Sequence, residues 1–220
     1  MSDLLIKLWQ NGILQLGIWE TVYMTLISTF FAYLIGLPVG LILRMTDRDG
    51  IHPIGWLNRT LGIIVNALRS IPFIILMVAM LPVAKFVVGT SLGNRAVIVT
   101  LVIAAAPYVA RMVESAAKEV NAGVIEAAQS MGASTLRIIC KVIIPEAKPA
   151  LITGGVISTV TILGYSAMSG AVGGGGLGKL AIMYGYNRYQ TDIMFITVVL
   201  LIVIVQVFQS FGNWATKRSD

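Results

Sequence analysis

Long segments without charged residues divide the chain. No Asp, Glu, Lys or Arg lies between Glu20 and Arg44, so residues 21–43 form one uncharged, mainly apolar segment. Residues 149–178 and 193–216 form two further segments of this kind. A helix rises about 1.5 Å per residue, so about 20 residues cross the roughly 30 Å hydrocarbon core of a bilayer. Each of these segments is therefore long enough to span a membrane.

Two other apolar segments are interrupted or shorter. Residues 60–84 contain a single charge, Arg69, and residues 96–110 lie between Arg95 and Arg111. The second length also suits a buried helix of a soluble protein, but flanking arginines can extend their charged ends to the membrane surface. Together the five segments predict an all-α, polytopic membrane protein with spans at residues 19–43, 61–84, 94–111, 150–169 and 193–214.

The first residues predict a surface helix rather than a secretion signal. Residues 1–18 lack a basic beginning and a small-residue cleavage site, and a full-length span follows directly. The apolar side chains of this stretch indicate an amphipathic segment lying on the outer surface, carried by Leu4, Leu5, Leu8 and Trp9.

The composition agrees with a membrane location. Hydrophobic residues make up 57% of the chain and charged residues 12%, against about 45–50% and 25% in soluble domains. The net charge of +6 also suits nucleic-acid binding, but the distribution of the basic residues favours membrane topology as its cause. We therefore expect no nucleic-acid partner, and membrane lipid as the surroundings of the chain.

The basic residues predict the orientation, because cytoplasmic loops are enriched in Lys and Arg. One side of the five predicted spans holds Arg44, Arg48, Arg59, Arg111, Lys118, Arg137, Lys141, Lys148, Lys217 and Arg218. The other side holds the smaller set of Lys7, Lys85, Arg95, Lys179 and Arg188. We expect the N-terminus outside and the C-terminus in the cytoplasm.

A half-polar stretch, residues 112–149, lies between the third and fourth predicted spans, on the cytoplasmic side. Its middle, VIEAAQSM, consists of good helix formers, and Gly132 follows where a left-handed residue ends a helix. Ser134 is a candidate N-cap for a second helix, which ends towards Pro145 and Pro149 and whose apolar face is predicted at Leu136, Ile139, Val142 and Ile143. A stretch this short is too small for a catalytic domain. A short exposed helix can instead dock into a groove on a soluble partner and transmit rigid-body motion.

This stretch resembles the EAA loop of ABC-importer permeases. In that pattern E-A-A is followed after three residues by G and, after nine more, by I-x-L-P. The residues that match at the right spacing are Glu126, Ala127, Ala128, Gly132 and Pro145, while Val142 and Ile144 replace the pattern's Ile and Leu. The resemblance extends to permease subunits of methionine ABC importers through ALRSIPFIILMV, VVGTSLG, AAPYVARMVESA and GYSAMSGAVGGGGLGKLAIMYGY.

The resemblance implies the type I importer fold, in a bacterial inner membrane. It also implies two identical permeases, two cytoplasmic ATPases and an outer methionine-binding lipoprotein. The ATPases would bind ATP and Mg²⁺, so we expect no cofactor, metal or enzymatic activity in this chain. The resemblance does not separate D- from L-methionine, and a permease for another small amino acid or sulfur compound is the alternative.

The resemblance also implies roles for individual residues. The helix at residues 122–131 would be the coupling helix, and residues 112–149 the coupling loop. Ala127 and Ala128 would be small so that this helix seats closely in an ATPase groove, Glu126 would pair with a basic residue there, and Gly132 would allow a sharp exit. From the residues alone, an ordinary connecting loop with a capped helix is the competing interpretation.

Two other stretches contain candidate pathway or gate residues. Arg69 stands inside a predicted span just before Pro72, which we expect to kink that span, while the Ser70 hydroxyl helps to satisfy the freed carbonyls. Arg69 either faces the pathway or reaches lipid headgroups at the membrane boundary. In the fourth span we expect close helix packing at Gly154 and Ser158, and a gate near Tyr165, Ser166 and Met168.

Other functions are less consistent with the sequence. The stretch GGGGLGK lacks the G-K-[ST] ending of a phosphate-binding loop, and we interpret it as a flexible re-entrant or loop segment on the outer face. His52 and Cys140 have no second ligand nearby, so a metal site is not expected. No acidic residue lies inside a predicted span, which disfavours an ion-coupled secondary transporter.

Overall fold

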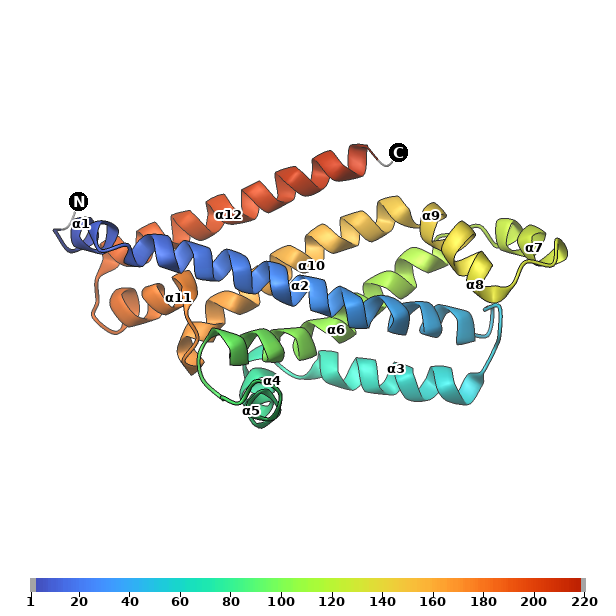
Figure 1. Cartoon of the computed structure of the whole chain (residues 1–220), viewed down its shortest axis with the longest axis horizontal. Helices are drawn as coiled ribbons and strands as arrows, with labels where there is room; N and C mark the ends of the chain where they lie inside the picture. The colour runs from blue at the N-terminus through green and yellow to red at the C-terminus, as the bar shows by residue number, and fades with distance from the viewer. Residues whose placement is uncertain (1–2, 219–220) are drawn as a thin grey trace.

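Four long helices form the body of the computed structural model, which describes the backbone of residues 3–218 and the side chains of residues 6–218. They are α2 (Ile13–Thr46), α6 (Asn94–Lys118), α10 (Lys148–Met168) and α12 (Thr191–Lys217). Each is long and apolar enough to cross a membrane, and Figure 1 shows them running along the length of the molecule. Helix α6 lies at the centre, with Val97, Leu101, Val109 and Val113 fully buried.

Short helices connect the long ones. They are α1 (Asp3–Gln10), α3 (Gly55–Ser70), α4 (Phe73–Ala79), α5 (Leu81–Val88), α7 (Ala122–Ser130), α8 (Thr135–Ile138), α9 (Ile144–Glu146) and α11 (Gly176–Leu180). Residues Ile139–Ile143 and Ala181–Tyr186 form π-helical turns, and Ser169–Val172 forms a 3₁₀ turn. No strand occurs in residues 3–218, and the predicted all-α class is confirmed.

The second predicted span, residues 61–84, is not one straight helix. Helix α3 ends at Ser70 and α4 begins at Phe73, with a bend of 105° between them. Pro72 cannot donate a helical hydrogen bond, and the residue before a proline is driven out of the α-helical region. Ile71 is accordingly extended, with φ −79° and ψ 129°. The expected kink is thus a complete break, and the bent pair is one span only if both helices are counted together.

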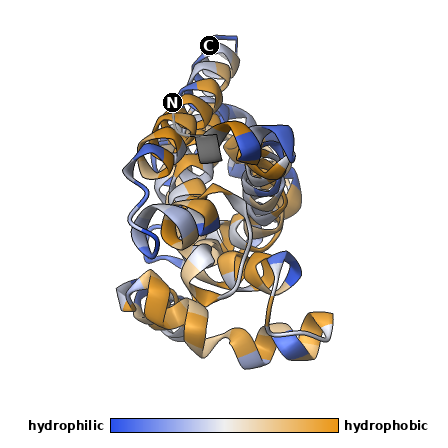
Figure 2. Ribbon diagram, turned by 90° about the vertical axis from the view of Figure 1, so that its left-hand side faces the viewer, coloured by the Kyte–Doolittle hydropathy of each residue, from blue (hydrophilic) through white to orange (hydrophobic). Residues whose placement is uncertain are grey.

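Close contact between the long helices depends on small residues. A Cβ on Gly36 of α2 would lie 2.7 Å from Val109 Cβ of α6, and one on Gly154 of α10 would lie 3.2 Å from Met112 Cε. Ser158 is also buried. The small face expected at Gly154 and Ser158 therefore packs inside this chain, against α6 and α2. The outer surfaces of the long helices are hydrophobic (Figure 2), as a lipid-facing surface requires.

The predicted N-terminal surface segment is shorter than expected. Helix α1 ends at Gln10, and residues 13–18 already belong to α2. Leu8 is buried against Leu14 and Leu177, whereas Trp9 is exposed. The side chains of Leu4 and Leu5 lie outside the described residues. Helix α1 therefore packs onto the end of the bundle where α2 begins and α11 lies (Figure 1).

Candidate functional site

Helix α7 carries the candidate coupling residues and lies at the end of the molecule opposite the N-terminus (Figure 1). Asn121 begins it by accepting a hydrogen bond from Gly123 N at 2.8 Å. Gly132 follows it in the left-handed conformation with φ 73°, as predicted. The Ala133 N–H donates to Ala128 O at 3.1 Å, the six-to-one bond of a Schellman motif. Both ends of this short helix are therefore fixed by local hydrogen bonds.

Helix α7 has one buried and one exposed face. Ile125 and Ala128 are buried in the same cluster as Ile138 and Ile143. Val124, Glu126, Ala127 and Met131 point outward, and Met131 is 81% exposed. The two alanines thus have different surroundings: Ala127 is free to contact a partner, whereas Ala128, 5% exposed, is small because it packs inside this chain.

Glu126 borders a cavity of about 340 Å³ between α7 and the segment that joins α2 to α3. Arg44, Asp49 and Gly50 line the opposite wall. The ion pairs within the described residues involve Asp47, Arg111, Glu114 and Lys118, and Glu126 takes no part in them. Its exposed carboxylate is therefore available to a basic group from another molecule.

The second helix of the coupling loop differs from the predicted pattern. Its buried residues are Ile138 and Ile143, five positions apart, while Leu136 is 74% exposed. The reason is the π-helical turn at residues 139–143, whose hydrogen bonds span five residues instead of four. Pro145 follows directly and remains inside helical backbone. Because its ring would clash with the carbonyl one turn earlier in a regular α-helix, Pro145 explains the widened turn.

The candidate pathway residues only partly come together. The Phe73 ring, next to Pro72, stacks on the Tyr165 ring with centroids 4.1 Å apart and planes 4° from parallel. Arg69 is exposed in the last turn of α3, and the Ser70 hydroxyl donates to Asn66 O at 2.8 Å as expected. This stack places the break at Pro72 beside α10.

The other two gate candidates of α10 lie apart from that stack. Ser166 is buried and donates to Leu163 O of its own helix at 2.7 Å. Met168 is exposed at the end of α10. Neither is in the ring contact, whereas Phe73 is in it and was missed by sequence reasoning; an aromatic residue after the helix-breaking Pro72 was the available indication.

A polar cluster at the other end of the molecule was also missed. Glu20 Oε1 accepts from Asn94 Nδ2 at 2.8 Å, and its Oε2 accepts from Gly176 N at 2.7 Å. Asn94 Oδ1 accepts from Gly175 N at 2.7 Å, and Thr21 Oγ1 accepts from Leu177 N at 2.9 Å. We call Glu20, Thr21 and Asn94 the outer clasp, because they attach the glycine-rich segment to α2 and α6.

The glycine-rich segment is packed rather than free. Residues 174–178 are buried, and a Cβ on Gly175 would collide with the Glu20 carboxylate. Gly176 has φ 85°, a conformation that side chains other than glycine rarely adopt. The prediction of a flexible segment was therefore wrong, because the glycines serve close contact and turning.

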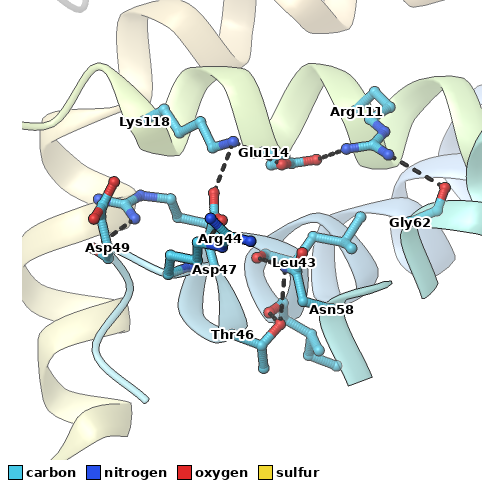
Figure 3. A network of polar contacts seen from close by, with 12 residues as sticks. Leu43, Arg44, Thr46, Asp47, Asp49, Asn58, Gly62, Arg111, Glu114 and Lys118 are labelled. Atoms are coloured by element: carbon cyan, nitrogen blue, oxygen red, sulfur yellow. Dashed lines mark hydrogen bonds and ion pairs between the residues drawn. The ribbon is translucent and has the colours of Figure 1, made fainter. Parts of the chain in front are cut away.

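Charged residues join three helices behind α7 (Figure 3). Lys118 Nζ is 2.9 Å from Asp47 Oδ2 and 2.9 Å from Glu114 Oε1. Arg111 Nη1 contacts Glu114 Oε2, and Arg111 Nη2 donates to Asn66 Oδ1 at 3.0 Å. The hydrogen bond from Lys118 lowers the pKa of the Asp47 carboxyl below its ordinary value. The carboxylate therefore stays ionised at neutral pH, and the ion pair persists there.

Comparison with known proteins identifies the family. Residues 36–220 match the family described as binding-protein-dependent transport system inner membrane component. The chain belongs to this family. The permease is 50% identical to the probable D-methionine transport system permease protein MetI of Vibrio cholerae over 210 residues, 96% of this chain and 93% of that protein. It is also 50% identical to the D-methionine transport system permease protein MetI of Escherichia coli over 154 residues, 70% of this chain and 71% of that protein.

Solved structures agree with this assignment. The permease resembles a chain from an inward-facing conformation of the MetNI methionine ABC transporter, with 45% identity, full coverage of both chains and a TM-score of 0.95. A chain of an amino acid ABC transporter, 19% identical, covers 99% of both chains with a TM-score of 0.79. At that identity the second likeness shows the shared fold alone.

Proposed function

We propose that this chain is the permease subunit of an ATP-driven methionine importer. The observation that carries the proposal is the match over the full chain to the permease of a methionine transporter, with a TM-score of 0.95 at 45% identity. The relatives at 50% identity are named for D-methionine transport. The chain itself would catalyse no covalent reaction, because its part is to open a path alternately to the two sides of the membrane.

The proposed assembly contains four more subunits. Two copies of an ATPase bind ATP and Mg²⁺ in the cytoplasm, a second copy of this permease completes the pathway, and an outer lipoprotein delivers methionine. With the C-terminus in the cytoplasm, α7 lies on the ATPase side and the outer clasp on the delivery side (Figure 1). The opposite placement of these two sites along the molecule supports this orientation.

The coupling helix carries the contact with the ATPase. Glu126 pairs with a basic residue in the ATPase groove, because its exposed carboxylate is not engaged within this chain. Ala127 allows a close approach, and Met131 adds exposed apolar surface beside it. Ala128, Gly132 and Pro145 act indirectly, by fixing how the helix is seated and left.

The pathway is proposed to open and close where α4 meets α10. The break before Pro72 frees α4 from the direction of α3, and the Phe73–Tyr165 stack joins it to α10. Ser166 and Met168 line the same end of α10 and become pathway residues only if that helix turns. Arg69, exposed in the last turn of α3, interacts with water or headgroups near the break.

Uptake of labelled methionine tests the proposed function. Cells without their own methionine importers would express this permease with the ATPase and binding protein encoded beside it, and unlabelled D- and L-amino acids would compete. We expect uptake that requires a functional ATPase and is competed chiefly by methionine. ATP-dependent uptake of another solute without methionine would overturn the substrate, and uptake with an inactive ATPase would overturn the mechanism.

A further inference from the structure

Glu114 is the one charged side chain that is buried in the described part of the chain, at 5% exposed. Its carboxylate lies between two cations of the same helix. Oε2 is 2.5 Å from Arg111 Nη1, and Oε1 is 2.9 Å from Lys118 Nζ. A buried ionised group is tolerated only when it is paired. Both oxygens of Glu114 meet this condition, so the site is built around its charge.

Each of the two cations also reaches a different helix. Lys118 Nζ contacts Asp47 Oδ2 at 2.9 Å, directly after the end of α2. Arg111 Nη2 donates to Asn66 Oδ1 of α3 at 3.0 Å. Glu114 therefore fixes the two side chains that hold α2 and α3 to α6 (Figure 3). We call Asp47, Asn66, Arg111, Glu114 and Lys118 the Glu114 bridge.

Helix α3 depends on polar contacts because apolar packing holds it weakly. Val65 is its one buried residue. Its other ties are the Arg111 contacts, including Arg111 Nη2 to Gly62 O at 3.3 Å, and the hydrogen bond from Asn58 Nδ2 to Leu43 O at 2.7 Å. Without the Arg111 contacts, little would prevent α3 from sliding along α6.

The Glu114 bridge lies between the coupling helix and the candidate gate. Helix α7 begins at Ala122, shortly after Lys118, and is seated on the bundle through Ile125. In the other direction, α3 runs from the bridge to the break before Pro72, beyond which Phe73 stacks on Tyr165. A displacement of α7 therefore reaches α3 through the end of α6.

We propose that Glu114 is a positioning residue that makes the cytoplasmic ends of α2, α3 and α6 move as one body with the coupling helix. This inference rests on the proposed permease function. Glu114 touches neither substrate nor ATPase in this scheme. It holds Arg111 and Lys118 in place, so that the motion of α7 is delivered to α3 and the bend instead of being lost between helices.

The test is the number of methionine molecules transported per ATP hydrolysed, in proteoliposomes containing the complete complex and binding protein. Glu114→Gln keeps the size of the side chain and removes its charge. We expect this ratio to fall by about tenfold, within the usual range of coupling between sites, with the complex assembled at the usual yield. Glu119→Gln, which changes an exposed carboxylate after the same helix, should leave the ratio unchanged.

A double variant separates positioning from simple charge balance. Arg111→Met with Glu114→Gln removes one charge of each sign but also removes the contact with Asn66. If Glu114 only neutralises Arg111, the double variant regains the transport ratio that Glu114→Gln loses. We expect no recovery, because the link to α3 is still absent; full recovery would overturn the proposal.

A second single variant covers a failure of Glu114→Gln to fold. Asn66→Ala leaves every charge of the bridge paired and cuts the contact with α3 at an exposed residue. We expect a loss of coupling in the same direction. A wild-type ratio in Asn66→Ala would overturn the proposal, whereas a wild-type complex without ATP-driven methionine uptake would refute the proposed function instead.

Discussion

Ala127 and Ala128 are neighbours in the sequence but face opposite surroundings, so enlarging them should have different effects. Ala128→Leu forces extra volume into a packed site and should lower the free energy of unfolding by about 1–3 kcal/mol. Ala127→Leu adds a side chain at an exposed position and should leave that free energy within about 0.5 kcal/mol. Thermal unfolding of the purified permease measures both.

Binding of the ATPase should reverse the order of these two variants. Ala127→Leu fills the surface that approaches the partner, so we expect it to reduce recovery of the ATPase with a tagged permease while the permease remains stable. Equal unfolding temperatures of the two variants would show that the buried and exposed faces of α7 are wrongly assigned.

Reversal of the charge at Glu126 tests its proposed partner. Glu126→Lys places a cation where a basic residue of the ATPase is expected, so repulsion replaces attraction. We expect methionine uptake to be abolished while the permease is inserted at its usual abundance. Glu146→Lys, an exposed acid in α9, provides the matched charge reversal and should transport normally. Uptake at the wild-type rate by Glu126→Lys would exclude the proposed pairing.

At the scale of elements, the outer clasp should determine how firmly the glycine-rich segment is held. Hydrogen bonds to a charged group contribute about 1.5–3 kcal/mol each, and Glu20→Gln replaces the ionised acceptor of two of them. We expect the amides of residues 175–177 to exchange hydrogen at least about tenfold faster, which corresponds to about 1.4 kcal/mol. Hydrogen exchange followed by mass spectrometry measures this, with Gln15→Ala at an exposed position of α2 as the control.

Unchanged exchange of these amides in Glu20→Gln would mean that packing alone holds the segment. The glycines then account for its order, through the close contacts of Gly175 and the left-handed backbone of Gly176.

The elements that local sequence determines were predicted well. Gly132 ends α7 as expected, because a left-handed glycine after a helix is a local signal. Pro72 indicated a kink, but the 105° bend also depends on where Phe73 finds a partner, and Tyr165 is far away in the chain. The outer clasp was not predictable for the same reason, since Glu20 lies 156 residues before Gly176. Hydropathy located the spans but contains no information on these pairings.

At the scale of the whole molecule, the order of the helices makes the broken span decisive for topology. If α3 and α4 together cross the membrane once, the chain crosses five times and its two ends lie on opposite sides. If they return to the side from which they came, four crossings remain and both ends share a side. The family assignment does not by itself place either end, so the orientation needs a direct measurement.

Labelling of single cysteines decides between these two topologies. Cys140 is the one cysteine of the sequence and is exposed in the coupling loop, where the proposed orientation places it in the cytoplasm. Leu92, exposed between α5 and α6, is expected on the outer side, so Leu92→Cys in a Cys140→Ser background is the partner variant. A maleimide that cannot cross membranes should label Leu92→Cys in intact cells and Cys140 only after the cells are opened. Because α6 separates these two positions, labelling of both in intact cells would contradict a crossing by α6, and the reverse pattern would invert the orientation and place α7 outside, away from any ATPase.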